Sequence, residues 1–206
     1  ISAEVRAEMG ARVARAVAGI GYRNAGTVEF LMDEQGRLYF MEMNTRLQVE
    51  HPVTEMVTGI DIVKEQIRIA AGEQLPFRQE DVTLRGHAME CRIYAEDPDR
   101  HIPSPGLVSN HHPPGGLGVR VETALYDGYR VPVHYDPLVA KLTVWAEDRD
   151  QCVARMRRAL KDFNLIGTPL MATGPRAGAA SRSLPPSVVL AVAACGSIRP
   201  TSTTRT

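Results

Sequence analysis

The feature that most constrains this chain is a predicted β-hairpin that leads directly into a segment of alternating polar and apolar residues. Residues 27–32 and 38–43 are rich in β-branched and apolar side chains, and Asp33-Glu34-Gln35-Gly36 between them has the composition of a tight turn. Over residues 42–50, an acid, an amide, an arginine, a second amide and a second acid occupy alternate positions. Because successive side chains of an extended strand point to opposite faces, these polar groups are predicted to share one face.

The hairpin is predicted to bring Glu29 close to Glu42. With a turn at residues 33–36, Glu29 would lie opposite Phe40, and Glu42 would be its diagonal neighbour on the same face, about 7–8 Å away along the backbone. Two such carboxylates repel each other unless a cation lies between them. With the Asn44 amide they form a small set of hard oxygen ligands, which suits Mg²⁺ or Mn²⁺ bound jointly with substrate phosphates.

Arg46 and Glu50 continue the same face. An arginine fork can hold a planar oxyanion with two hydrogen bonds, and a nearby carboxylate can accept a proton from that anion. Bicarbonate is a substrate of this kind, because it is small, planar and anionic and still carries a proton. The alternation by itself also fits a strand with one solvated face, and the acids of the hairpin also fit ordinary surface charge. The concentration of acid, amide and guanidinium groups on one side favours a catalytic interpretation.

The rest of the sequence predicts helices and strands with a boundary near residue 84. Asp61 is a predicted helix N-cap, and Pro- and Gly-rich turns at 103–106 and 113–118 separate the later strands. Residues 168–206 contain arginine but no Asp, Glu or Lys, and their composition predicts a disordered tail. The predicted helices cover residues 1–20, 62–71 and 150–163, and the predicted strands outside the hairpin cover residues 86–95, 119–123 and 138–145.

The composition argues against several classes of function. The 24 Lys and Arg residues balance 24 Asp and Glu residues, so nothing favours binding to nucleic acid or to an anionic membrane. The longest apolar run, Val188–Cys195, is far too short for a membrane span, which takes about 20 residues. Three cysteines without a C-x-x-C pair indicate reduced thiols and a cytoplasmic location. The opening at Ile1, inside a predicted amphipathic helix, indicates a fragment of a longer protein.

Several motifs resemble those of the biotin carboxylase family of ATP-grasp enzymes. The most specific is E-M-N-T-R-L-Q-V-E-H-P at 42–52, and R-G-H-A-M-E-C-R-I at 85–93 and Y-D-P-L-V-A-K-L at 135–142 also match. The resemblance covers residues 1–167; the remainder matches nothing in the family, as a shifted reading frame would produce.

The resemblance implies an α+β fold in three parts. Residues 1–84 would form the carboxyl-terminal part of an ATP-grasp domain, which is an antiparallel sheet with helices. Residues 85–167 would form an incomplete, mostly β biotin carboxylase C-terminal domain. Residues 168–206 would remain an atypical tail.

The resemblance also implies a metal site and a nucleotide site. Glu29 and Glu42 match carboxylates that bind Mg²⁺ or Mn²⁺, with Asn44 beside them. The ATP-contacting positions are Glu29, Leu31, Met41 and Glu42, of which Leu31 and Met41 are the apolar lining.

A second implied group handles bicarbonate and biotin. Arg46, Gln48 and the backbone of Val49 match positions that hold bicarbonate. Glu50 matches the base that deprotonates bicarbonate for attack on the γ-phosphate of ATP. Arg92 matches the arginine that binds biotin and stabilises its enolate-like form, and Arg46, Glu50 and Arg92 are therefore the expected catalytic residues.

The implied activity is that of a ligase: ATP-dependent carboxylation of biotin on a biotin carboxyl carrier protein, through carboxyphosphate. This is the first half-reaction of biotin-dependent carboxylases such as acetyl-CoA carboxylase, which serves fatty acid biosynthesis. The implied partners are the carrier protein, carboxyltransferase subunits and a second copy of the full-length protein, with Leu117 and Arg120 in the region of the dimer contact.

Two other interpretations remain open from the sequence. The chain could belong to another ATP-grasp ligase such as a carbamoyl-phosphate synthetase, although the R-x-Q-x-E segment at 46–50 argues against this. It could also be a catalytically silent module that binds carboxylase partners. The glycine-rich lid and ATP-contacting lysines of the family have no counterpart in this sequence, so the chain alone is expected to lack activity.

Overall fold

The computed structural model describes residues 2–97, 99–100, 102–167, 171–173 and 191–194, which fall into two compact units. The first unit contains the chain up to His51, residues 60–82 and the short strand at 191–194. The second contains residues 52–59 and the chain from Thr83 to the strand at 171–173. Within these ranges, no helix is long and apolar enough to cross a membrane.

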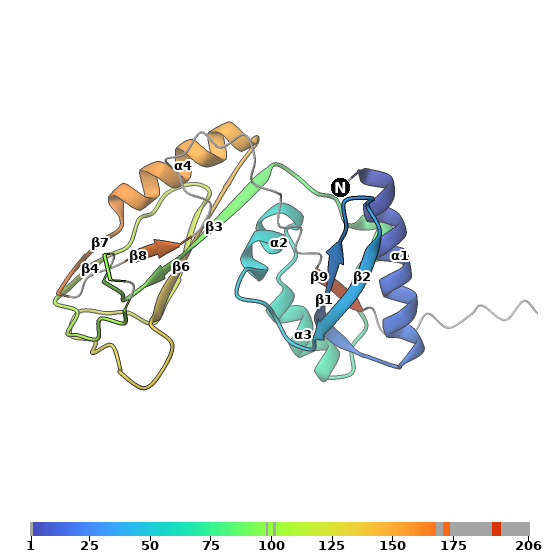
Figure 1. The fold of residues 1–206 in the computed structure, drawn as a ribbon, viewed down its shortest axis with the longest axis horizontal. Helices are drawn as coiled ribbons and strands as arrows, with labels where there is room; N and C mark the ends of the chain where they lie inside the picture. Colours follow the sequence, from blue (N-terminus) through green and yellow to red (C-terminus); the bar gives the residue numbers. More distant parts are fainter. Residues whose placement is uncertain (1, 98, 101, 168–170, 174–190, 195–206) are drawn as a thin grey trace, which may run out of the picture. The chain divides into compact units, whose positions relative to one another are not determined.

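In the first unit a long helix packs against a β-hairpin (Figure 1). Helix α1 (Ala3–Gly19) begins at the N-cap Ser2, whose hydroxyl accepts a hydrogen bond from the Val5 amide. Its buried residues Met9, Val13 and Val17 recur every fourth position and contact the apolar side chains of the hairpin. Burial of each such side chain contributes on the order of 1.5–3 kcal/mol, so this stripe decides which face of the hairpin is covered.

The hairpin consists of β1 (Asn24–Met32) and β2 (Leu38–Asn44). A third strand, β9 (Ala191–Ala194), pairs with the other edge of β1, and both pairings are antiparallel. The face of the hairpin opposite α1 is the one that carries the acidic residues, as described below, and helix α3 (Ile62–Ala70) covers the start of β1 on that face at Ala25.

Helix α3 and the 3₁₀ turn η1 (Gln79–Asp81) complete the first unit. Asp61 is the N-cap of α3, as predicted, and accepts a hydrogen bond from the Lys64 amide at 2.9 Å.

The second unit is built on an antiparallel sheet in the order β5-β6-β3-β8, with helix α4 packed on one face (Figure 1). Alternate residues of β3 are buried, which is the pattern of a sheet covered on one side, and β6 follows it except that Thr143 is buried as well. The bounds are β3 His87–Tyr94, β5 Val119–Thr123, β6 Leu138–Ala146, β8 Met171–Thr173 and α4 Arg149–Asp162.

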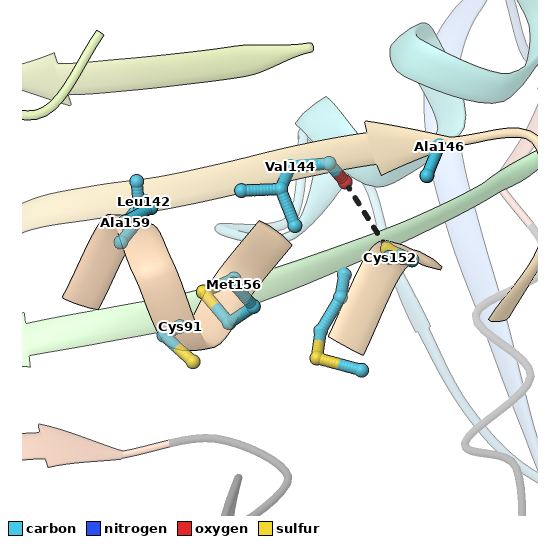
Figure 2. Packing of buried hydrophobic residues seen from close by; sticks show 8 residues of the cluster. Cys91, Leu142, Val144, Ala146, Cys152, Met156 and Ala159 are labelled. Atoms are coloured by element: carbon cyan, nitrogen blue, oxygen red, sulfur yellow. Dashed lines mark hydrogen bonds between the residues drawn. The ribbon is translucent and has the colours of Figure 1, made fainter. Parts of the chain in front are cut away.

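Helix α4 and the sheet enclose the main hydrophobic core of the second unit (Figure 2). Met156 of α4 and Leu142 of β6 are fully buried, and the thiol of Cys152 lies 3.7 Å from the backbone oxygen of Val144. Burial and, to a smaller extent, the charge of the adjacent Glu90 raise the pKa of Cys91 to about 11, so the thiol stays neutral near pH 7. Cys91 is a core residue without the properties of a nucleophile.

Further short elements flank this sheet. Strands β4 (Asn110–His112) and β7 (Asn164–Ile166) pair with each other. Helix α2 (His51–Thr58) belongs to the second unit from Pro52 onward, where the Arg85 amide donates a hydrogen bond to the Val57 backbone oxygen at 2.8 Å.

The α+β class and the main predicted helices and strands are confirmed. Helix α2 and strands β4 and β7 were not predicted, because they are short and carry little periodic pattern. Within residues 168–206, strands β8 and β9 are described, and the other residues of the predicted disordered tail lie outside the described ranges.

Candidate functional site

Glu29 and Glu42 lie directly opposite each other on β1 and β2, and the predicted diagonal arrangement is therefore wrong. Phe40 pairs with Phe30, not with Glu29, and the register shifts at the next step, so Met41 is an extra residue on β2. This β-bulge aligns the two carboxylates as cross-strand partners. The sequence pattern could not reveal it, because one inserted residue changes the register without changing the hydrophobic composition.

The side chain of Asn44 bridges the two carboxylates. Its Nδ2 donates hydrogen bonds to Glu29 Oε1 at 2.9 Å and to Glu42 Oε1 at 3.0 Å. Asn44 lies two residues beyond Glu42 on β2, opposite Thr27, so its side chain shares the face of both acids. The amide thus offsets part of the repulsion that two neighbouring carboxylates exert on each other.

Gln48 connects this acidic pair to Arg46. The Gln48 amide nitrogen donates to Glu29 Oε1 at 3.1 Å, and its Oε1 accepts a hydrogen bond from Arg46 Nη1 at 2.6 Å. Arg46 Nη1 also donates to the backbone oxygen of Leu47 at 3.0 Å. We call the residues Glu29, Glu42, Asn44, Arg46 and Gln48 the hydrogen-bonded cluster.

The chain leaves this cluster through a turn at His51. The His51 amide donates to the Gln48 backbone oxygen at 3.3 Å, and the ring Nδ1 lies 2.8 Å from the same oxygen. These contacts close the turn that precedes α2, which indicates a structural role for His51.

An apolar surface lies on the same face of the hairpin, toward its turn. Leu31 is two residues from Glu29 along β1, and Tyr39 is its direct partner on β2. Leu31 is 60% exposed, Tyr39 49% and Met41, the bulge residue, 46%. Leu31 and Met41 were predicted for the nucleotide site, and that remains a prediction. The sequence did not point to Tyr39, because only the correct register places it beside Leu31.

The remaining predicted residues lie further along the chain. Val49 and Glu50 are partly buried and follow Gln48 directly. Arg92 lies on β3 of the second unit, where its cross-strand partner on β6 is Lys141.

The donor set of the cluster fits a hard divalent cation. Asn44 and Gln48 donate only to the Oε1 atoms of Glu29 and Glu42. Among the residues that the structure describes, the second oxygen of each carboxylate accepts no hydrogen bond and remains available as a ligand. Carboxylate and amide oxygens are the ligands that Mg²⁺ and Mn²⁺ prefer.

Two family models match the chain. Residues 1–78 match the carbamoyl-phosphate synthase L chain, ATP binding domain, and residues 90–173 match the biotin carboxylase C-terminal domain. The second match reaches beyond residue 167, where the sequence resemblance was expected to end.

Curated relatives are similar over most of this chain. The biotin carboxylase of Allochromatium vinosum is 60% identical over 167 residues, which are 81% of this chain and 37% of that protein. The biotin carboxylase of Pseudomonas aeruginosa is 59% identical over the same shares of the two chains. The chain therefore spans less than two fifths of the length of these relatives.

Solved structures agree with the sequence comparison. The biotin carboxylase domain of the 2-oxoglutarate carboxylase from Hydrogenobacter thermophilus, in complex with MgADP, ADP and bicarbonate, superposes with a TM-score of 0.80 at 52% identity. That similarity covers 82% of this chain and 38% of the other. By its family models, its sequence and its fold, this chain belongs to the biotin carboxylase family.

Proposed function

We propose that this chain supplies the metal-, bicarbonate- and biotin-binding residues of an enzyme that carboxylates biotin with ATP and bicarbonate. The observation that carries the proposal is the hydrogen-bonded cluster, which links two neighbouring carboxylates to an arginine within one network. The structural relative that was solved with MgADP and bicarbonate supports it.

Glu29, Glu42 and Asn44 would hold the metal. Mg²⁺ or Mn²⁺ held by these three side chains would supply positive charge that offsets the negative charge built up during phosphoryl transfer. Leu31 and Met41, together with Tyr39, would offer an apolar surface to the flat base of the nucleotide.

Arg46, Gln48 and the backbone of Val49 would hold bicarbonate. Glu50 would take the bicarbonate proton, and the resulting oxyanion would attack the γ-phosphorus, which breaks the bond to ADP and forms carboxyphosphate. Carboxyphosphate would then split into CO₂ and phosphate.

Arg92 would act in the second step. Phosphate would remove the proton from N1 of biotin, and the guanidinium of Arg92 would stabilise the enolate-like oxygen that results. The nitrogen would then form its new bond to the carbon of CO₂.

The wider role is also part of the proposal. Carboxybiotin would pass on a carrier protein to a carboxyltransferase, in a homodimeric cytoplasmic enzyme with Leu117 and Arg120 near the dimer contact. The named relatives include a pyruvate carboxylase subunit and a methylcrotonoyl-CoA carboxylase subunit, so the final acceptor varies within the family. Acetyl-CoA and fatty acid biosynthesis are one such destination.

A hybrid enzyme would test this function. The matching part of this chain would replace the corresponding 167 residues of the Allochromatium vinosum enzyme, and biotin-dependent release of phosphate from ATP would be measured. We expect the hybrid to be active and to require bicarbonate. Phosphate release that does not depend on biotin would instead favour another ATP-grasp ligase.

Single substitutions in the hybrid would assign the cluster. Glu42→Gln is expected to lower kcat by about 100-fold or more, since it removes a charged metal ligand. The control is Glu34→Gln, an exposed acid in the hairpin turn, which should leave the rate unchanged. Equal rates for both variants would contradict the proposed metal site.

A further inference from the structure

A β-turn separates the hydrogen-bonded cluster from helix α2. Its four residues are Gln48, Val49, Glu50 and His51, and the His51 amide closes it with a hydrogen bond to the Gln48 backbone oxygen at 3.3 Å. Val49 and Glu50 are the two central residues of this turn, so its dihedral angles decide the direction of the Val49 backbone and of the Glu50 side chain. All four residues are partly buried.

The side chain of His51 makes a second contact across the same turn. Its ring Nδ1 lies 2.8 Å from the Gln48 backbone oxygen, closer than the backbone amide that closes the turn. Because a carbonyl oxygen can only accept a hydrogen bond, Nδ1 carries the hydrogen. A neutral ring with its hydrogen on Nδ1 and a protonated ring both meet this requirement. One residue therefore closes the turn twice, through its backbone and through its ring.

The oxygen that accepts both bonds belongs to a residue of the hydrogen-bonded cluster. The Gln48 side chain donates to Glu29 Oε1 at 3.1 Å and accepts from Arg46 Nη1 at 2.6 Å. Gln48 is thus held through its side chain by the cluster and through its backbone by His51. Val49 and Glu50 have further interactions of their own, so His51 shares the support of this turn with other groups.

We propose that His51 is a positioning residue for the bicarbonate step, which it supports by holding the turn that carries Val49 and Glu50. This inference rests on the proposed function, in which the Val49 backbone holds bicarbonate and Glu50 takes its proton. It adds His51 to that step through the bond to Gln48 and assigns no proton transfer to the ring. The biotin step, which uses Arg92, should be insensitive to it.

The activity test uses the hybrid enzyme with His51→Leu and His51→Asn. Leucine has no hydrogen-bond donor, whereas the amide nitrogen of asparagine follows Cβ and Cγ as Nδ1 does in histidine and can donate to the same oxygen. We expect His51→Leu to lower kcat/KM for bicarbonate about tenfold, with the KM for biotin unchanged at saturating bicarbonate. His51→Asn should recover most of that loss.

Rescue distinguishes positioning from a loss of packing. Equal losses in His51→Leu and His51→Asn would show that the ring only fills space, and equal losses toward bicarbonate and biotin would show general damage to the fold; either result rejects the inference. An unchanged kcat/KM for bicarbonate in His51→Leu would also overturn it and, in an active hybrid, would leave the proposed function intact. The matched control is His112→Leu, at an exposed histidine on β4, which should have no effect.

A second measurement needs no activity. In the 206-residue chain itself, NMR of the His51 ring nitrogens reports which of them carries hydrogen, and the Val49 amide signal reports on the turn. We expect hydrogen on Nδ1 at neutral pH. We also expect a Val49 signal that His51→Leu shifts and His51→Asn leaves close to wild type, with thermal unfolding of each variant as the check on folding. A ring with its hydrogen on Nε2 alone, or a Val49 signal that is the same in all three proteins, would reject the inference whether or not the hybrid is active.

Discussion

At the scale of single residues, the site depends on amides as much as on charges. Asn44 donates to both carboxylates of the hairpin, and Gln48 uses its two ends to join Glu29 to Arg46. An amide can do this because it carries a donor and an acceptor and no net charge. The two acids are thus held in one place before any cation arrives.

Replacing Asn44 by Asp tests this arrangement. Three neighbouring carboxylates would repel one another, so the chain should lose about 1 kcal/mol of stability in EDTA. Excess MgCl₂ should then raise the unfolding temperature of Asn44→Asp more than that of the wild type, as measured by thermal unfolding. Asn164→Asp, at an exposed position on β7, is the control, and an equal response of both variants to MgCl₂ would contradict the prediction.

At the scale of elements, the hairpin combines a stabilised turn with a bulge. The Asp33 carboxylate accepts hydrogen bonds from the backbone amides of Gln35 and Arg37, from Arg37 Nε at 2.7 Å and from the Tyr39 hydroxyl. These contacts fix the turn, and the bulge at Met41 then sets Glu29 directly opposite Glu42.

The turn predicts a pH dependence. Desolvation acts to raise the pKa of Asp33, but the hydrogen bonds from Arg37, Tyr39 and Gln35 outweigh it and lower the pKa below 3.8. The contribution of Asp33 to stability is therefore complete above about pH 4 and is lost as the pH falls through the lowered pKa. Asp33→Asn should be less stable at pH 7 and should lose less stability on acidification, as followed by urea unfolding between neutral and acidic pH. Parallel acid profiles for the two proteins would refute this.

A glycine at the start of β3 makes a second element-scale prediction. Gly86 has φ +67°, and a Cβ there would lie 2.4 Å from the Ala146 backbone oxygen, whereas Gly128 has φ +90° with open space around it. Gly86→Ala should cost about 3 kcal/mol or more, from backbone strain plus the clash, and Gly128→Ala about 1 kcal/mol from strain alone. Chemical denaturation measures both, and similar losses would show that the close approach does not matter.

At the scale of the whole molecule, the chain corresponds to only part of the sequence of its relatives. It spans 37% of the length of the Allochromatium vinosum enzyme, and its hairpin presents large apolar side chains to solvent. Exposed apolar surface beside a polar site is typical of a binding surface for a ligand or for further protein.

The isolated chain is accordingly expected to show no bicarbonate-dependent ATP hydrolysis above background. The chain matches 37% of the Allochromatium vinosum enzyme, and phosphoryl transfer needs groups that position the phosphates as well as a metal site. A phosphate-release assay on the purified chain, with the hybrid enzyme as positive control, measures this. Activity that rises with bicarbonate in the chain alone would contradict the expectation.

Much of this protein could be predicted from its sequence. The stripe of α1, the N-cap at Asp61 and the alternation over 42–50 are local patterns, and each reports directly on the structure that its own residues adopt. Because these patterns are local, the sequence by itself was enough to predict the α+β class. It was also enough to single out every residue of the hydrogen-bonded cluster.

Other features were decided only by the tertiary structure. The direct pairing of Glu29 with Glu42 depends on a bulge, and the pairing of Lys141 with Arg92 on one side and Glu122 on the other depends on how β3, β6 and β5 align. Register and cross-strand neighbours follow from the packing of a whole sheet, because a shift of one residue costs little locally but moves every side chain to a new partner. The sequence therefore specifies which chemical groups are present, whereas the alignment of the strands decides which of them are in contact.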